Sequence, residues 1–167
     1  MIRPATPEDL PRVAEIFGHY ALNTCATFET IPPSIDKWAE KLAVTTDRGW
    51  PFLVTAHDDE VNGFCYCSAW RTQPAYLHTA EESIYLAPDQ TGRGLGRPLL
   101  TAMIDALGAT RVTQVLAVIA DAGDPASASL HRSLGFSEVG RLRNVGYKSD
   151  RWLDTVLYQR AMGATDA

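Results

Sequence analysis

The glycines at positions 92, 94 and 96 stand where the sequence pattern changes from strand to helix. Glycine lets the backbone turn tightly and expose successive amide N–H groups, and the first amides of a helix carry the positive end of its dipole. A turn of this kind binds anions, phosphates above all. The sequence therefore predicts a binding site for a phosphate-bearing cofactor at this turn.

Two common phosphate-binding patterns do not fit the turn. The GxxxxGK[ST] pattern fails because no lysine follows the glycines. The third glycine of a dinucleotide fingerprint that starts at Gly92 would fall at Arg97. A tight strand-to-helix turn without a ligand is the plain alternative.

Other motifs point to one family. Gly94-Leu-Gly96, after an arginine and before an amphipathic helix, resembles the pyrophosphate-binding turn of the GCN5-related N-acetyltransferases (GNAT). His131-Arg-Ser-Leu-Gly135-Phe136 resembles the helix-end motif of the same superfamily. Further segments are similar to its phosphinothricin acetyltransferase branch: Thr27-Phe28-Glu29, Ala75-Tyr76, Thr79-Ala-Glu81, Val145-Gly-Tyr-Lys148 and Trp152-Leu-Asp154. The resemblance extends from about Ile2 to Arg160.

The resemblance implies that an acetyl group passes directly from acetyl-CoA to the amine of a small amino-acid-like acceptor. An amine with a pKa near 10 is mostly protonated at neutral pH, so a base must first take a proton. Glu81, which opens the strand before the glycine turn, is the candidate base; an exposed acid beside Glu82 is the alternative. Side chains alternate along a strand, so at most one of the two acids addresses a cleft directly.

The departing CoA thiolate leaves more readily when it is protonated. Many relatives have a tyrosine at this helix position. This sequence has His131 there, and the phosphinothricin branch also has a histidine. A histidine has an ordinary pKa near 6.5, so it can act as the acid or as a hydrogen-bond partner. A histidine that only packs within its helix is the alternative.

The resemblance also implies the contacts to acetyl-CoA. Backbone groups of Tyr85 and Leu86 would face the thioester carbonyl, where an N–H acts as an oxyanion donor. The other expected contacts are Thr91, Gly92, Arg93, Gly94, Leu95, Gly96, Arg97, Asp124 and Ser127. Relatives commonly have Gln or Arg in place of Thr91, and Asn in place of Asp124, where the change removes an amide donor.

On the acceptor side, the resemblance implies phosphinothricin, methionine sulfoximine or methionine sulfone, bound partly across a homodimer interface. The expected acceptor residues are polar or aromatic residues near the cleft, namely Phe28, Glu29, Arg71, Tyr76 and Lys148. A guanidinium suits bidentate capture of a carboxylate or phosphinate. The alternative for each of these residues is that it lies in a loop and only contacts solvent.

The elements that must position these residues follow the order β-α-α-β-β-β-α-β-α-β-β. Helices are expected from Thr6, after Ser34 with Ile35, Trp38 and Leu42 buried, over 95–108 and over 125–134. Strands are expected at 2–3, 52–56, 61–71, 79–86 and 112–119, and in a final pair joined by 146–150 with Trp152 buried. The fold class is α/β (α+β): the GNAT fold, a twisted, mixed and mostly antiparallel sheet flanked by about four helices.

Length and composition set the broad class. The chain has 167 residues, 46% hydrophobic and 21% charged, which suits one domain, expected over 1–162 with a tail at 163–167. The N-terminus lacks an apolar signal and no apolar run is long enough to cross a membrane, so a cytoplasmic protein is expected.

Charge and metal-ligand patterns exclude other classes. A net charge of −5 argues against a general nucleic-acid binder. No CxxC pair and no metal-ligand spacing of histidines occurs, so neither disulfides nor a metal is expected.

Other acceptors, and a function without catalysis, are the alternatives to this activity. A peptide or protein N-terminus, or a polyamine, is the alternative acceptor. A non-catalytic acetyl-CoA-binding module would keep the glycine turn but would not need Glu81 and His131. The resemblance also implies a resistance activity against a herbicide or antibiotic, with a housekeeping activity as the alternative.

Overall fold

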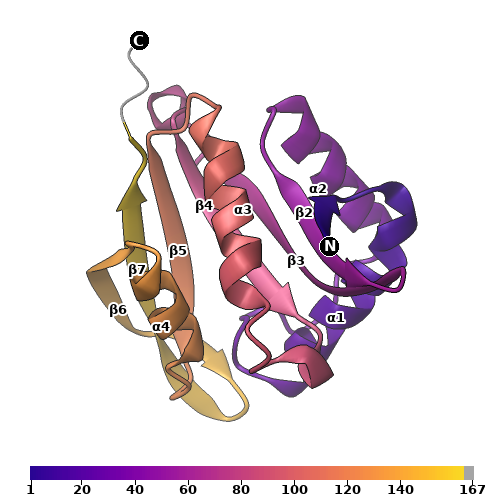
Figure 1. Cartoon of the computed structure of the whole chain (residues 1–167). Helices are drawn as coiled ribbons and strands as arrows, with labels where there is room; N and C mark the ends of the chain where they lie inside the picture. The colour runs from indigo at the N-terminus through magenta and orange to yellow at the C-terminus, as the bar shows by residue number, and fades with distance from the viewer. Residues whose placement is uncertain (164–167) are drawn as a thin grey trace.

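A sheet of seven strands crosses the molecule in the spatial order β1-β2-β3-β4-β5-β7-β6 (Figure 1). The computed structural model describes residues 1–163. Its strands are β1 (Ile2–Pro4), β2 (Phe52–His57), β3 (Glu60–Ala69), β4 (Thr79–Leu86), β5 (Gln114–Asp121), β6 (Ser137–Lys148) and β7 (Arg151–Ala161). Its α-helices are α1 (Leu10–Asn23), α2 (Ile35–Asp47), α3 (Gly96–Gly108) and α4 (Ala126–Ser133). The expected order of elements is confirmed.

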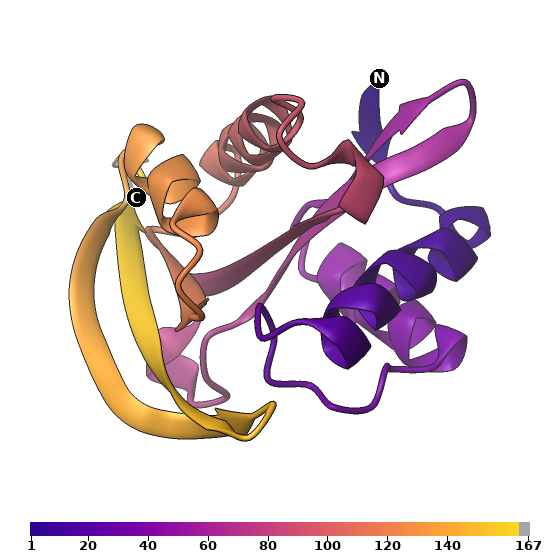
Figure 2. The ribbon, with the colours of Figure 1, turned by 90° about the horizontal axis from the view of Figure 1, so that it is seen from below.

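The helices lie in two layers on opposite faces of the sheet. Seen from below, α3 and α4 cover one face, while α1 and α2 cover the other (Figure 2). Among the described residues, only β4 and β5 pair in parallel; the other pairings are antiparallel. The mixed, mostly antiparallel sheet expected from the sequence is therefore confirmed.

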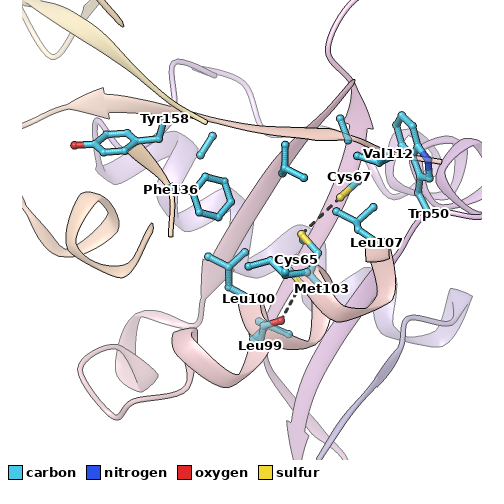
Figure 3. Packing of buried hydrophobic residues seen from close by; sticks show 14 of the residues in the cluster. Trp50, Cys65, Cys67, Leu99, Leu100, Met103, Leu107, Val112, Phe136 and Tyr158 are labelled. Carbon is cyan, nitrogen blue, oxygen red and sulfur yellow. Dashed lines mark hydrogen bonds between the residues drawn. The ribbon is translucent and has the colours of Figure 1, made fainter. Parts of the chain in front are cut away.

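Strand β3 shows how the alternating pattern builds a core on each face. Cys65 and Cys67 point to the α3 side, where the sulfur of Cys67 lies 3.6 Å from that of Met103 (Figure 3). Phe64 and Tyr66 point to the α1 and α2 side and pack on Trp38, which is fully buried. Burying each large apolar side chain stabilises the fold by roughly 1.5–3 kcal/mol.

The parallel pairing of β4 and β5 stops halfway along both strands. Its ladder runs from Thr79 opposite Gln114 to Glu82 opposite Ala117. Both strands continue beyond that point, β4 to Leu86 and β5 to Asp121. Residues 83–86 and 118–121 therefore diverge and leave an opening within the sheet.

Several predicted boundaries were displaced. A 3-10 turn over Pro7–Asp9 precedes α1, which begins at Leu10 rather than near Thr6. Strand β3 ends at Ala69, and β5 starts at Gln114, two residues after Val112, which is buried outside the strand. A β-branched run predicts buried residues well, but it does not show where the ladder begins.

The C-terminal hairpin also differs from expectation. Gly146 and Lys148 belong to β6, and the turn is Ser149-Asp150, with positive φ at both residues. Trp152, expected to be buried, is 62% exposed and lies against the exposed ring of Tyr147.

Helix α2 starts as predicted, because the Ser34 hydroxyl accepts a hydrogen bond from the Lys37 N–H. Its Ile35, expected on the buried face, is 49% exposed. Of the expected tail at 163–167, all but Gly163 lies outside the described residues.

Candidate active site

The opening between β4 and β5 contains a cavity of about 370 Å³, called here the strand cavity. Its walls are β4 and β5 around the point where they diverge, the glycine turn, and α4 with the loop before it. They include Ser83, Ile84, Tyr85, Leu86, Ala117, Val118, Ile119 and Ala120 from the strands, and Thr91, Gly92, Gly96, Asp124, Ser127 and His131 from the turn and α4. The cavity therefore forms where the β4–β5 ladder ends.

The glycine turn has the backbone that an anion site needs. Gly92 and Gly94 have φ values of 71° and 79°, a region that side chains disfavour. In the part of the chain that the structure describes, the amides of residues 92–95 have no backbone partner. Those N–H groups remain available to a ligand, next to the N-terminus of α3.

The close approach of two helices explains the third glycine. A Cβ on Gly96 would lie 3.2 Å from the Leu130 side chain on α4. Arg97, expected to contact the cofactor, donates to the Ser133 hydroxyl at 2.7 Å and so ties α3 to the end of α4. Arg93 is exposed, and Arg93, Gly94, Leu95 and Arg97 do not line the strand cavity.

The predicted residues Thr91 and Asp124 make local turn contacts. The Thr91 hydroxyl donates to the Pro88 carbonyl at 3.0 Å, and the Asp124 carboxylate accepts from the Ala126 N–H at 2.9 Å. Asp124 therefore holds the start of α4. Ser127 lines the cavity one turn before His131.

His131 is buried with both ring nitrogens engaged. Its Nδ1 lies 2.7 Å from the Ser127 carbonyl, and its Nε2 lies 2.5 Å from Glu82 Oε1. A carbonyl oxygen only accepts, so Nδ1 must carry a proton. Burial opposes a charge on the ring, but the hydrogen bond and charge of Glu82 outweigh it and raise the pKa of His131.

Glu82 was not singled out as a site residue from the sequence. It is buried, and its Oε2 has no hydrogen-bond partner among the described residues. It pairs with a residue 49 positions away. No local pattern signals such a contact, and only the strand alternation from Glu81 hinted that Glu82 would face the other side of the sheet.

The strand register shows which amides of β4 face the opening. Ala87 donates to the Asn62 carbonyl of the β3 side, so by alternation the Tyr85 N–H also points to β3. The Leu86 N–H then points away from β3, toward the opening. Of the two residues predicted to supply an oxyanion donor, Leu86 has the suitable direction, and its carbonyl accepts from the Tyr20 hydroxyl at 2.7 Å.

A second cavity of about 310 Å³, called here the loop cavity, lies on the α1 and α2 side. Glu81 lines it together with Phe28 and Glu29, which are three of the predicted site residues. The loop cavity shares Ala26, Ser83, Tyr85, Val118 and Ala120 with the strand cavity. The two cavities therefore meet through the gap between β4 and β5.

The environment of Glu81 suits a proton acceptor. Its burial, and then the charge of Glu82, raise the pKa of Glu81, while Lys41 lowers it in part. A carboxylate with a raised pKa is a stronger base than an exposed one. Glu81 and Glu82 thus face different cavities from neighbouring positions of one strand.

The other predicted acceptor residues are divided. Lys148 donates from Nζ to the carbonyls of Thr27 and Glu29, both at 2.8 Å, so it holds the loop in place. The Phe28 ring packs directly on Gly146, where a Cβ would collide with it. Arg71 and Tyr76 are exposed and line neither cavity, so their role stays a prediction.

Two absences concern the described residues only. No helix within residues 1–163 is both long and apolar enough to cross a membrane. In the same range, no group of His, Cys, Asp or Glu side chains is arranged to hold a metal ion.

Residues 2–157 match the acetyltransferase (GNAT) domain. The chain is 38% identical over 165 residues to phosphinothricin N-acetyltransferase of Alcaligenes faecalis, covering 99% of this chain and 84% of that protein. It is 34% identical over 165 residues to the L-methionine sulfoximine/L-methionine sulfone acetyltransferase of Pseudomonas aeruginosa, covering 98% and 95%.

The structure superposes on a crystal structure of a GNAT superfamily phosphinothricin acetyltransferase from Sinorhizobium meliloti in complex with AcCoA. The TM-score is 0.93 at 38% identity, and the match covers 98% of this chain and 88% of the other. The fold expected from the sequence motifs is thereby confirmed.

Proposed function

This chain belongs to the GNAT acetyltransferases and uses acetyl-CoA, and we propose that its acceptor is the amino group of a small amino acid analogue. The observation that carries the proposal is the meeting of the two cavities through the gap between β4 and β5. A thioester held from the α3 and α4 face would face an amine held from the α1 and α2 face.

The strand cavity fits acetyl-CoA. The unpartnered amides of the glycine turn suit a pyrophosphate, and the unpaired edge of residues 83–86 suits the amide groups of an extended pantetheine arm. When bound, acetyl-CoA supplies an acetyl group already activated as a thioester. The chain's own residues have to position it and move protons.

Two groups of β4 serve the transfer in this proposal. Glu81 takes a proton from the acceptor's ammonium, which frees the nitrogen lone pair for direct attack without a covalent enzyme intermediate. The Leu86 N–H donates to the acetyl carbonyl oxygen, where it stabilises negative charge as that charge develops. Both groups belong to one short strand, so their spacing is rigid.

His131 supplies the proton for the departing sulfur in this proposal. Because its Nδ1 proton is held by the Ser127 carbonyl, the proton that it can give lies between Nε2 and Glu82. The hydrogen bond and charge of Glu82 raise the pKa of His131, which favours retention of that proton. Glu82 acts through His131 as a positioning residue.

The acceptor class is supported by the named relatives and by the size of the site. Proteins 34–38% identical to this chain are named for phosphinothricin and for methionine sulfoximine and sulfone. A cavity of about 310 Å³ is at the lower end of the usual range for small-molecule sites. We assign this chain the same kind of acceptor, and infer that it acts as a homodimer.

The test is release of free CoA thiol from acetyl-CoA during incubation with a panel of amines. The panel holds phosphinothricin, methionine sulfoximine, methionine sulfone, natural amino acids, peptides with free N-termini and polyamines. Turnover with the small amino acid analogues is the expected result. Turnover with only peptides or polyamines would overturn the acceptor assignment.

A further inference from the structure

Lys41 of α2 lies at the junction of two hollows. It lines the loop cavity, and it also lines a neighbouring groove of about 580 Å³ between α2 and β3. Glu29 and Tyr66 line both hollows with it. The Lys41 ammonium therefore stands beside the place proposed for the acceptor.

Aromatic groups fix the position of this ammonium. Nζ donates to the Tyr66 hydroxyl at 3.0 Å and lies 5.1 Å from the ring centroid of Trp38. Trp38 is fully buried, so this support is rigid. A hydroxyl and a π face attract an ammonium without supplying a counter-charge.

The charge of Lys41 has no ion-pair partner in residues 1–163. No carboxylate oxygen there lies within 4.0 Å of its Nζ. An ammonium has three donors, of which the Tyr66 hydroxyl occupies one. Donors therefore remain for an anion that enters the loop cavity.

The other cations considered for the acceptor are less suited. Two of the three Lys148 donors are committed to the carbonyls of Thr27 and Glu29, and Lys148 does not line the loop cavity. Arg71 is exposed outside the loop cavity, where its guanidinium lies 5.4 Å from the centroid of the Trp70 ring. Among residues 1–163, Lys41 is thus the cation that combines a place in the loop cavity with unused donors.

We infer that Lys41, supported by Tyr66, binds the carboxylate of the amino acid acceptor while Glu81 receives its amine. This inference rests on the proposed function. It makes the site complementary to a zwitterion, with an ammonium for the acceptor's negative end and a carboxylate for its positive end. Lys41 then determines specificity for a free carboxylate.

The experiment compares methionine sulfone with its carboxamide in the wild-type protein and in Lys41→Gln. The ratio of kcat/KM for acid over amide is expected to fall by roughly 10- to 100-fold in the variant, as the loss of a charge-assisted hydrogen bond predicts. The amide differs in amine basicity, but that difference is the same in both proteins and cancels.

Controls separate charge from folding. Lys41→Arg keeps the charge and should keep much of the ratio. Lys37→Gln, one turn earlier on α2, removes an exposed lysine that pairs with Glu40 and should leave the ratio unchanged. The KM for acetyl-CoA should match the wild type in all three variants, which shows that each is folded.

An unchanged acid-to-amide ratio in Lys41→Gln overturns the inference while leaving the proposed function standing. An equal loss of kcat/KM with the acid and with the amide also overturns the inference and leaves the proposed function standing. If the wild-type protein acetylates neither methionine sulfone nor any other small amino acid, the proposed function fails, and the inference fails with it.

Discussion

The imidazole of His131 and the carboxylate of Glu82 meet at 2.5 Å in the wall of the strand cavity, and both side chains are only 2% exposed. Since Nδ1 donates to the Ser127 carbonyl, one proton lies between Nε2 and Oε1. The pair is therefore electrically neutral overall, which limits the cost of burying it. Its proton belongs to both residues together.

Replacing Glu82 by glutamine should lower the pKa of His131, because a neutral amide no longer favours the imidazolium. Titration of the ring proton resonances by NMR measures this directly. The same change should reduce the free energy of unfolding by roughly 1–3 kcal/mol. An unchanged His131 titration would contradict the pairing.

The stability effect of this pair should depend on pH with a defined sign. The pKa of His131 is raised in the folded state, so its contribution is fully present below the unfolded pKa of about 6.5. It is lost as pH rises through the folded value. Urea unfolding should therefore show the gap between wild type and Glu82→Gln narrowing toward high pH.

Glu81→Gln should lower kcat by roughly 10²- to 10⁴-fold, because the amine loses its proton acceptor. In the wild type, activity should fall as pH drops through the raised pKa of Glu81, since the base must be unprotonated. The variant should lack that limb. Glu15→Gln, an exposed acid on α1, is the matched control, and a wild-type profile in Glu81→Gln would refute the assignment.

Gly94→Ala should weaken acetyl-CoA binding by about tenfold, because a side chain at positive φ costs roughly 1–2 kcal/mol and displaces the turn amides. Gly49→Ala is a control with a similar φ, 68°, beyond the end of α2. Both variants should lose stability, but only Gly94→Ala should raise the KM for acetyl-CoA. Equal KM values in the two variants would show that the turn does not hold the cosubstrate.

Lys148→Met should raise the KM for the acceptor several-fold while leaving that for acetyl-CoA within about twofold. The change frees the Thr27 and Glu29 carbonyls and loosens one wall of the loop cavity. Stability should fall by roughly 1–3 kcal/mol, which thermal unfolding can measure. A rise in the KM for acetyl-CoA alone would contradict the assignment of Lys148 to the acceptor side of the site.

Much of the fold could be predicted from local sequence patterns. Capping residues such as Ser34 indicate where helices begin. Residues 64–67 indicate a strand because alternate side chains suit opposite faces of a sheet. The exposure of individual side chains was harder to predict. Ile35 and Trp152 have apolar side chains at plausible positions, but nothing in the described chain covers them.

The site was predictable only in part. The glycine turn and Glu81 could be identified because the residues that mark each of them are close together in the sequence. The opening of the sheet is not, since residues 83–86 have the strand propensity of their paired neighbours. Lys41 was missed because a lysine in a helix usually lies on the solvated face, and only the fold brings it beside Tyr66.

The interrupted ladder between β4 and β5 also bears on how the protein behaves without its cosubstrate. Residues 83–86 pair with β3 and residues 118–121 with β7, but the edges that these two segments turn toward each other have no ladder partner, and such free edges are templates for pairing with other chains. A ligand in the opening protects those edges and stabilises only the folded state, by about 2.7 kcal/mol at a hundred times its Kd. Depletion of acetyl-CoA is therefore expected to lower the stability of the folded enzyme and to leave these strand edges open to association with other chains.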